Sequence, residues 1–381
     1  MKRRVAYVTG TRADYGLFSE ALKRIREHPE LELGLIVTAM HLEPQFGMTV
    51  AEIESDGMPI VARVRSLEAD DTGAAQARSV GRVLIGITDA LAEFQPEVLV
   101  VLGDRGEMLA GAAAAVHLGI AVAHVHGGEV SGTVDELVRH AITKLSHVHF
   151  TATEDAAHRI RKMGERPENV HVVGAAGLDY LRRFEPIPDA EISRDVGFDV
   201  MRPFIIFTQH PVTGEVDEAA AQMRTSLRAL EDSGLQVVAT YPNSDAGGRA
   251  MIDVLKEWKG DWLHVFPSLG QRKFATLLKR AKAMVGNSSS GIIEAPFFGV
   301  PAVNVGTRQA GRLRAGNVVD VTYDTAAMRE AIDCAVNDAA FRERVLTSPS
   351  PYGDGHAGER IVEVLGALEI GPELLNKQIA Y

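Results

Sequence analysis

Short β-branched apolar runs alternate with longer amphipathic segments along almost the whole chain. In the first half, RRVAYVTG precedes LFSEALKRIREH, EVLVVLGD precedes EMLAGAAAAVHLG, and IAVAHVHGG precedes VDELVRHAITKLS. A strand that is apolar at consecutive positions is buried on both faces, which is typical of a parallel sheet covered by helices. The pattern therefore predicts a doubly wound α/β fold.

A second series of the same kind begins after FEPIPDAEISRDVGFDVMRP, a polar stretch with prolines and little periodicity. It runs through FIIFTQH, LQVVATYP, FATLLKRAKAMVGNSSS and PAVNVG. A chain of 381 residues is too long for one ordinary core. We therefore predict two Rossmann-like domains with a central cleft, residues 1–182 and 183–381, and regard the last helix, residues 356–368, as a candidate to pack back on the first domain.

Composition narrows the class of protein. A net charge of -11 and a pI near 5.7 argue against a partner such as nucleic acid or an anionic membrane, because both favour basic surfaces. The single cysteine, Cys334, excludes an intrachain disulfide and fits a reducing cytoplasm. MKRRVAYVTG is interpreted as a first strand and not as a signal peptide. No apolar run approaches the roughly 20 residues that span a bilayer, so we expect a cytoplasmic protein that binds a small ligand.

The densest group of titratable residues lies in HVHGGEVSGTVDELVRHAITKLSHVHF, residues 124–150. Acid/base chemistry needs groups whose pKa values neighbours can shift, so His126, Glu129 and Asp135 are candidates, together with Asp104 after the strand EVLVVL. Asp135 has a competing interpretation, since it stands in the first turn of a predicted helix and favours the helix dipole. A zinc site is an alternative for so many histidines, but no HExxH or cysteine-pair pattern supports it, and we predict no metal.

Two glycine turns are suited to phosphate. GTRADYG ends the first strand, and there Arg12 adds a fixed cation beside a helix N-terminus. GNSSSGIIEAPFFGVP stands in the equivalent place of the second half, with three serines able to cap a helix and a carboxylate one turn later. The candidate residues of this second turn are Ser288, Ser289, Ser290 and Glu294. GTRADYG lacks the GxGxxG spacing, which argues against a nicotinamide dinucleotide.

His210 follows the strand FIIFTQ of the second half and precedes Pro211. A proline favours an extended residue before it, which would project the imidazole from the strand end. His210 is therefore a candidate to carry a proton or to contact a phosphate.

At these residues the chain resembles the UDP-N-acetylglucosamine 2-epimerase family, in particular its hydrolysing branch that serves sialic and related nonulosonic acids. The resemblance rests on GTRADYG, TAMHLEPQFG, GDRGEM, HVHGGEVSGTVDELVRHAITKLSH, TQHPVT, YPNSDAGG, GNSSSGIIEAP and GTRQAGR, which occur in family order across residues 10–312. It implies a glycosyltransferase-B type architecture, no metal, no cofactor, a UDP-sugar substrate and a homodimer or homotetramer.

The resemblance also implies roles for individual residues. Arg12 and His210 would contact the diphosphate, the serine turn would hold phosphate, and Glu294 would hold the ribose. Four more residues would lie along the nucleotide and sugar: Asn243, Asp245, Arg308 and Asn317. Asp104, Glu129 and Asp135 would lie near the sugar ring. The chain departs from many relatives at His126, where a glutamate is common, so the group that removes the C2 proton stays open.

The expected reaction is release of UDP and N-acetylmannosamine from UDP-N-acetylglucosamine through a 2-acetamidoglucal. One alternative is the UDP-linked 2,4-diacetamido-2,4,6-trideoxyglucose of the legionaminic acid route. A second alternative is a glycosyltransferase that binds UDP with the same residues. A third is a binding module that would tolerate loss of the acid/base residues. Turnover of a UDP-sugar without an acceptor separates these classes.

Overall fold

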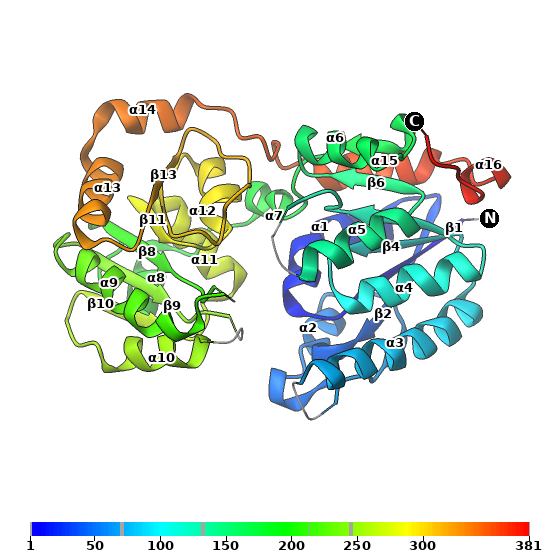
Figure 1. Cartoon of the computed structure of the whole chain (residues 1–381), viewed down its shortest axis with the longest axis horizontal. Helices are drawn as coiled ribbons and strands as arrows, with labels where there is room; N and C mark the ends of the chain where they lie inside the picture. The colour runs from blue at the N-terminus through cyan, green and yellow to red at the C-terminus, as the bar shows by residue number, and fades with distance from the viewer. Residues whose placement is uncertain (1, 69–71, 131–133, 213, 244–246, 381) are drawn as a thin grey trace. The chain divides into compact units, whose positions relative to one another are not determined.

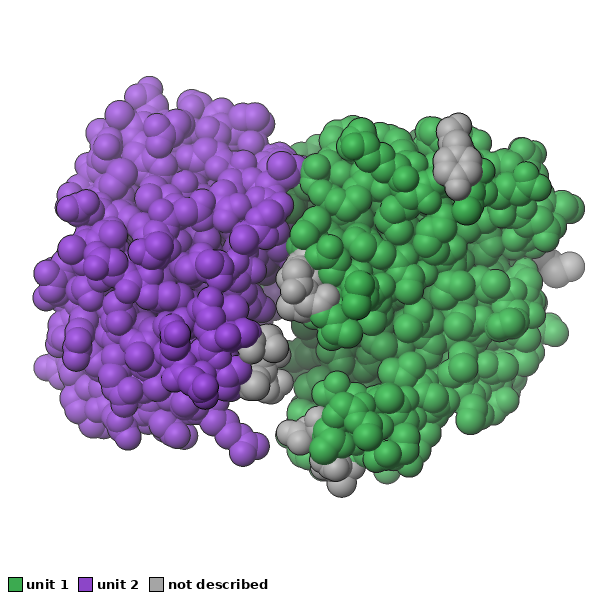
Figure 2. Space-filling view, in the orientation of Figure 1, with its two compact units in different colours: residues 1–182, 352–381 green, residues 183–351 purple. Residues whose placement is uncertain are grey.

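The computed structural model describes residues 2–68, 72–130, 134–212, 214–243 and 247–380. The chain forms two compact units, coloured separately in Figure 2. Unit 1 comprises residues 1–182 and 352–381, and unit 2 comprises residues 183–351. Across the described ranges, no helix combines the length and apolar character needed to cross a membrane.

Unit 1 is built on a seven-stranded sheet with the order β3-β2-β1-β4-β5-β6-β7, in which every neighbouring pair is parallel. Its strands are β1 (Arg3–Thr9), β2 (Leu31–Thr38), β3 (Ile60–Val64), β4 (Val98–Leu102), β5 (Ala121–Val125), β6 (Val148–Thr151) and β7 (Val170–Val172). Neighbouring residues of a strand serve opposite cores: Val5 and Tyr7 of β1 belong to one cluster of buried side chains, and Ala6 and Val8 to another. This is why the strands carry continuous apolar runs.

Helices cover both faces of this sheet (Figure 1). They are α1 (Arg12–Glu27), α2 (Val50–Ser55), α3 (Gly73–Phe94), α4 (Gly106–His117), α5 (Val134–Leu145), α6 (Glu154–Lys162), α7 (Leu178–Arg183), α15 (Ala357–Ala367) and α16 (Pro372–Leu375), with short 3-10 turns η1 (Ala39–Leu42), η2 (Pro44–Phe46) and η3 (Pro167–Asn169). Buried residues of α1 and α15 share one core, and those of α3, α4 and α5 share the other.

The last part of the chain belongs to unit 1, where α15 packs against α1. The Asp179 carboxylate of α7 accepts hydrogen bonds from the amides of Ala357 (2.9 Å) and Gly358 (2.7 Å), so it caps the start of α15. Arg3 of β1 donates to backbone carbonyls at the other end of α15, including that of Gly366 at 3.0 Å. Both ends of the returning helix are thus tied to unit 1.

Unit 2 repeats the architecture with a six-stranded parallel sheet of order β10-β9-β8-β11-β12-β13. Its strands are β8 (Phe204–Thr208), β9 (Gln236–Thr240), β10 (Leu263–Phe266), β11 (Ala283–Gly286), β12 (Ala302–Val305) and β13 (Val318–Val321). Its helices are α8 (Asp189–Val196), α9 (Ala219–Glu231), α10 (Gly248–Glu257), α11 (Gly270–Arg280), α12 (Ser290–Ile293), α13 (Thr325–Asn337) and α14 (Ala339–Thr347), with 3-10 turns η4 (Val216–Glu218) and η5 (Ala295–Phe298). The predicted fold of two Rossmann-like α/β domains is confirmed.

Candidate active site

The strand order of each unit reverses direction at one place, between β1 and β4 in unit 1 and between β8 and β11 in unit 2. Open parallel sheets bind ligands beyond the carboxyl ends of the strands at such switch points. The turns that follow these four strands are GTRADYG, GDRGEM, TQHPVT and GNSSSG. The strand order therefore brings two predicted motifs together within each unit.

The turn after β1 is organised by a capping box at the start of α1. The Thr11 hydroxyl accepts from the Asp14 amide, and the Asp14 carboxylate accepts from the amides of Thr11 (2.7 Å) and Gly10 (3.2 Å). Burial raises the pKa of Asp14 to about 6, against the hydrogen bonds from Thr9 and Thr11. Arg12 lies at the surface, with its Nε 3.2 Å from Glu52. Because exposed ion pairs are weak, an anionic ligand can compete for this guanidinium.

Arg139 of α5 joins the two motifs that follow β4 and β5. Its guanidinium donates to the Asp104 carboxylate and, at 3.0 Å, to the backbone carbonyl of Glu129. Arg139 is buried, whereas Asp104 stays about a quarter exposed. The structure thus links Asp104 to the HGGE turn through one cation.

His126 is the first residue of the HGGE turn and adopts a left-handed φ of 62°. Its Nε2 accepts a hydrogen bond from the Ala176 amide at 3.2 Å, and its Nδ1 lies 3.2 Å from Glu129 Oε1. Both side chains are largely buried, with 14% and 13% of their surface exposed. The structure therefore brings His126 and Glu129 together as a pair.

The neighbouring histidines of this segment have structural partners. His124 is fully buried with Nε2 2.8 Å from the Gly103 carbonyl, and burial lowers the pKa of His124 to about 3. His147 Nδ1 accepts from the Val122 amide at 2.9 Å, and His149 contacts Glu165 at 3.2 Å. A neutral His124 donates to the carbonyl beside Asp104 and so supports that turn.

Asp135 lies exposed in the first turn of α5. Arg105, the residue after Asp104, is close enough to respond to its charge: burial opposes the positive charge of Arg105, but Glu107, Asp14 and Asp135 hold the pKa of Arg105 above its ordinary value. Arg105 and Arg139 stand inside the motifs GDRGEM and HVHGGEVSGTVDELVRHAITKLSH, but the motifs do not show what either side chain contacts. Only the fold shows that both arginines lie beside the predicted carboxylates.

In unit 2, His210 is clamped at the end of β8. Asn287 Oδ1 accepts from the His210 amide at 2.6 Å, and Asn287 Nδ2 donates to the His210 carbonyl at 2.8 Å. His210 Nδ1 accepts from the Asn243 amide at 2.9 Å. Burial, with the nearby charge of Arg308, lowers the pKa of His210 to about 4. The ring is therefore neutral near pH 7, and its Nε2 carries the proton.

The serine turn follows β11 directly. Gly286 has a φ of 125°, and a Cβ there would lie 2.0 Å from the Thr208 carbonyl oxygen, so only glycine lets β11 end this close to β8. Ser288, Ser289 and Ser290 are half-buried, and Ser288 Oγ accepts from the Ser290 amide at 3.3 Å. Burial raises the pKa of Glu294, against a hydrogen bond from Ser290. The serines and Glu294 thus form one local group.

Two of the remaining predicted residues lie around this turn in different ways. Arg308 is half-buried and donates to the Asn287 carbonyl at 3.3 Å. Asn317 is fully buried, and its Nδ2 donates to the carbonyls of Gly291 (3.0 Å) and Val300 (3.1 Å). Asn317 therefore supports the backbone beneath the turn, and its predicted place along the nucleotide and sugar stays a prediction. Asp245 lies outside the described residues.

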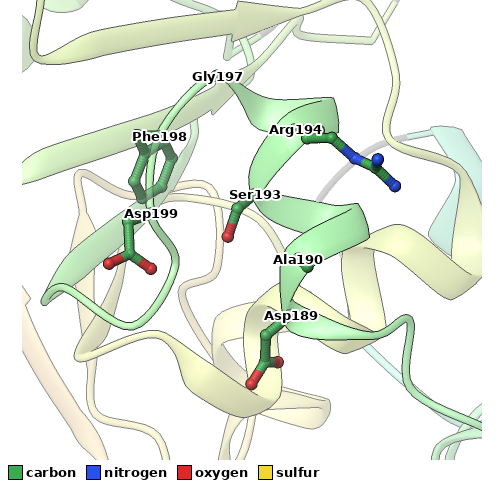
Figure 3. A pocket seen from close by; sticks show the side chains of 7 residues that line it. All are labelled: Asp189, Ala190, Ser193, Arg194, Gly197, Phe198 and Asp199. Atoms are coloured by element: carbon green, nitrogen blue, oxygen red, sulfur yellow. The ribbon is translucent and has the colours of Figure 1, made fainter.

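Two surface hollows lie away from this site. One, on unit 2, is lined by α8 and the segment after it, including Ser193, Arg194 and Phe198 (Figure 3). Another, of about 630 Å³ in unit 1, is lined by residues of η1, α2 and β3 together with Met48 and Arg65. None of the predicted site residues lines either hollow. Within the described ranges, no three His, Cys, Asp or Glu side chains form a group able to hold a metal ion.

A protein-family model described as UDP-N-acetylglucosamine 2-epimerase matches residues 23–366. The chain belongs to this family. It is 41% identical over its full length to the UDP-N,N'-diacetylbacillosamine 2-epimerase (hydrolyzing) of Legionella pneumophila, which is also covered in full. It is 36% identical to the UDP-N-acetylglucosamine 2-epimerase of Neisseria meningitidis, with 89% of each chain covered. The predicted family and class of enzyme, a UDP-sugar 2-epimerase, are confirmed.

Solved structures of the UDP-N-acetylglucosamine 2-epimerase family share the fold. The Neisseria meningitidis UDP-GlcNAc 2-epimerase bound to UDP-GlcNAc matches with a TM-score of 0.81 at 20% identity, over 95% of this chain and 99% of that one. A Staphylococcus aureus MnaA structure with UDP gives a TM-score of 0.80 at 21% identity, over 96% of both chains. The predicted glycosyltransferase-B type fold is confirmed by these matches.

Proposed function

We propose that the protein is a hydrolysing 2-epimerase whose substrate is UDP-N,N'-diacetylbacillosamine, the UDP-linked 2,4-diacetamido-2,4,6-trideoxyglucose. The observation that carries this proposal is the full-length relative of that name at 41% identity. It replaces the preference for UDP-N-acetylglucosamine drawn from the motifs. UDP-N-acetylglucosamine is the second candidate, because a relative at 36% identity bears its name.

The proposed reaction has two steps. A base removes the C2 proton while the C1–oxygen bond to UDP breaks, which leaves a C1–C2 double bond in the sugar. Water then adds its oxygen to C1, and C2 receives a proton on the opposite face. The sum is UDP-sugar and water giving UDP and the free 2-epimeric sugar, with no oxidant or reductant needed.

Unit 1 supplies the acid/base groups of this proposal. Two carboxylate residues there contact Arg139. Its guanidinium donates to the side chain of Asp104 and to the backbone carbonyl of Glu129. A positioned carboxylate can take a proton from the sugar in one step and return one in the next. Asp135 retains its proposed place near the sugar ring, with helix capping as the competing role.

Unit 2 supplies the nucleotide-binding groups. His210 has its Nε2–H as a donor for a phosphate oxygen, since Nδ1 already accepts from Asn243. A neutral imidazole donor lowers the energy of the departing diphosphate without a fixed charge. The serine turn, Glu294 and Arg308 are proposed to hold the rest of UDP, with Arg12 of unit 1 as a further phosphate contact.

Product analysis with the two nucleotide sugars tests the substrate. Each sugar is incubated with the enzyme without an acceptor, and released UDP and free sugar are quantified. We expect kcat/KM for the diacetamido sugar to exceed that for UDP-N-acetylglucosamine by at least about 10-fold, the low end of what one or two well-placed contacts discriminate. A higher kcat/KM for UDP-N-acetylglucosamine would contradict the proposed substrate and favour UDP-N-acetylglucosamine.

UDP is expected to raise the stability of the protein by about 2.7 kcal/mol at 100 times its dissociation constant. Glu294→Ala should weaken this stabilisation strongly if Glu294 holds the ribose. Thermal unfolding with and without UDP measures both, and Glu330→Ala on α13 serves as a matched control. Equal stabilisation of wild type and Glu294→Ala would remove Glu294 from the nucleotide site.

We also propose a homo-oligomer, a dimer or tetramer. Ile85 on α3 and Leu137 on α5 are 67% and 72% exposed, and both helices lie on the same face of the sheet of unit 1 (Figure 1), where a partner copy could cover them. Sedimentation at micromolar concentration should give a species at least twice 41.1 kDa. A single species of monomer mass would rule out this proposal.

A further inference from the structure

The imidazole of His126 is held from two sides. The Ala176 amide approaches Nε2 at 3.2 Å, and Glu129 Oε1 lies 3.2 Å from Nδ1. The two nitrogens therefore face two different partners. The donor or acceptor character of each partner decides which nitrogen carries the proton.

The Ala176 amide is a fixed donor. Ala176 is buried, the neighbouring Ala175 amide donates to the Tyr352 carbonyl at 2.7 Å, and the Ala176 carbonyl accepts from Asp179 at 3.2 Å. A backbone N–H can only donate, so Nε2 must present its lone pair. In a neutral imidazole the proton then sits on Nδ1, the nitrogen that lies 3.2 Å from Glu129 Oε1.

The backbone around Glu129 is equally constrained. Arg139 donates to the Glu129 carbonyl at 3.0 Å, and Arg159 donates to the Gly128 carbonyl. Gly128 has a φ of 76°, and a Cβ there would lie 2.4 Å from the Ala156 carbonyl oxygen. With the backbone held, the carboxylate of Glu129 can move only about its own side-chain bonds. The imidazole is the group that limits this movement on the Nδ1 side.

We propose that His126 is a positioning residue that orients the Glu129 carboxylate through Nδ1–H and does not itself take the C2 proton. Nδ1 already holds a proton, and protonating Nε2 would break the bond to Ala176 and leave a buried amide without its acceptor. The inference rests on the proposed function, in which a carboxylate acts at C2. Of the two neighbouring groups, Glu129 is then the base.

Two substitutions at position 126 separate positioning from proton transfer. Asparagine tolerates the left-handed φ and keeps an N–H near the place of Nδ1, whereas alanine removes the donor. We expect His126→Ala to lower kcat by roughly 10²-fold, as a small misplacement of a reacting group does. His126→Asn should recover most of that loss, to within about 10-fold of wild type. KM and UDP affinity should change little in both, and substitution of the exposed His117 at the end of α4, His117→Ala, is the control.

A double-mutant cycle with Glu129→Gln gives the sharper test. Because His126 is proposed to act through Glu129, His126→Ala should add less than about 3-fold to the loss that Glu129→Gln causes alone, as residues that act as a unit are not additive. Incorporation of deuterium at C2, quantified by mass spectrometry after long incubations, measures the turnover of even the slowest variants.

Three results would overturn the inference. The first is an equal loss of 10²–10⁴-fold in His126→Asn and His126→Ala that adds fully to Glu129→Gln, the result expected if His126 were the base. The second is full activity in His126→Ala. The third is a parallel loss of melting temperature and UDP affinity, which marks a purely structural histidine. Failure of the proposed function is recognised separately, since the wild-type enzyme would then place no deuterium at C2.

Discussion

Glu129→Gln is expected to lower turnover of the UDP-sugar by roughly 10²–10⁴-fold, the usual loss when an acid/base group is removed. Glutamine keeps the size and the backbone bond to Arg139 but cannot accept the C2 proton. UDP affinity should stay close to that of wild type, because the nucleotide groups proposed here lie mostly in unit 2. Release of UDP under saturating substrate measures turnover, and calorimetry with UDP measures binding.

Asp104→Asn and Asp135→Asn extend this experiment, and Glu154→Gln on the exposed first turn of α6 is its control. Asp104→Asn removes the charge paired with buried Arg139, so a comparable loss of turnover is expected. Wild-type turnover in Glu129→Gln would exclude Glu129 from the chemistry. Unchanged turnover in Asp135→Asn would leave that residue only its helix-capping role.

Glu165→Gln is expected to cost about 3–5 kcal/mol of folding stability at pH 7, the range for breaking a buried ion pair. Only 3% of the Glu165 side chain is exposed, and its oxygens lie 2.5 Å from Lys144 Nζ and 2.6 Å from Lys377 Nζ. His149 adds a third contact at 3.2 Å. Lys377 belongs to the C-terminal segment, so this carboxylate also holds the end of the chain on unit 1.

The Glu165 carboxylate also predicts that the folding stability depends on pH. Burial alone would raise the pKa of Glu165, but the hydrogen bonds from His149, Lys144 and Lys377 outweigh it and lower the pKa from 4.5 to about 2. A carboxyl with a depressed pKa in the folded state stabilises the fold above pH 4.5 and loses that contribution as the pH falls toward 2. Urea unfolding between pH 7 and pH 2 should therefore show the gap between wild type and Glu165→Gln shrinking below pH 4.5. Parallel curves would contradict this, and Glu168→Gln on exposed η3 is the control.

The parallel sheets could be predicted from sequence because their strands are buried on both faces. In β8, Ile205 and Phe207 serve one core while Phe204 and Ile206 serve the other, so no polar residue interrupts the run. The glycine turns could be predicted for a related reason: Gly286 tolerates a close approach that any side chain would block. Both are local properties, so one segment of the sequence is enough to predict each of them.

Contacts between distant segments could not be predicted in this way. The partner of His126 Nε2 is a backbone amide at Ala176, a residue with no distinguishing side chain. Arg139 and Asp104 stand on different elements, and only the order β4-β5 brings α5 to the end of β4. The contacts of Asn317 are of the same kind, since its amide donates to the carbonyls of Gly291 and Val300, which lie far from it in the sequence.

Turnover of UDP-N,N'-diacetylbacillosamine in heavy water tests the central proposal most directly. The enzyme is incubated with the nucleotide sugar without an acceptor, and the released sugar is analysed by NMR and mass spectrometry. The proposed elimination and hydration predict UDP and a free sugar inverted at C2 that carries one deuterium at that carbon. A released sugar that is unlabelled and uninverted at C2 would contradict the proposal, since simple hydrolysis never breaks the C2–H bond.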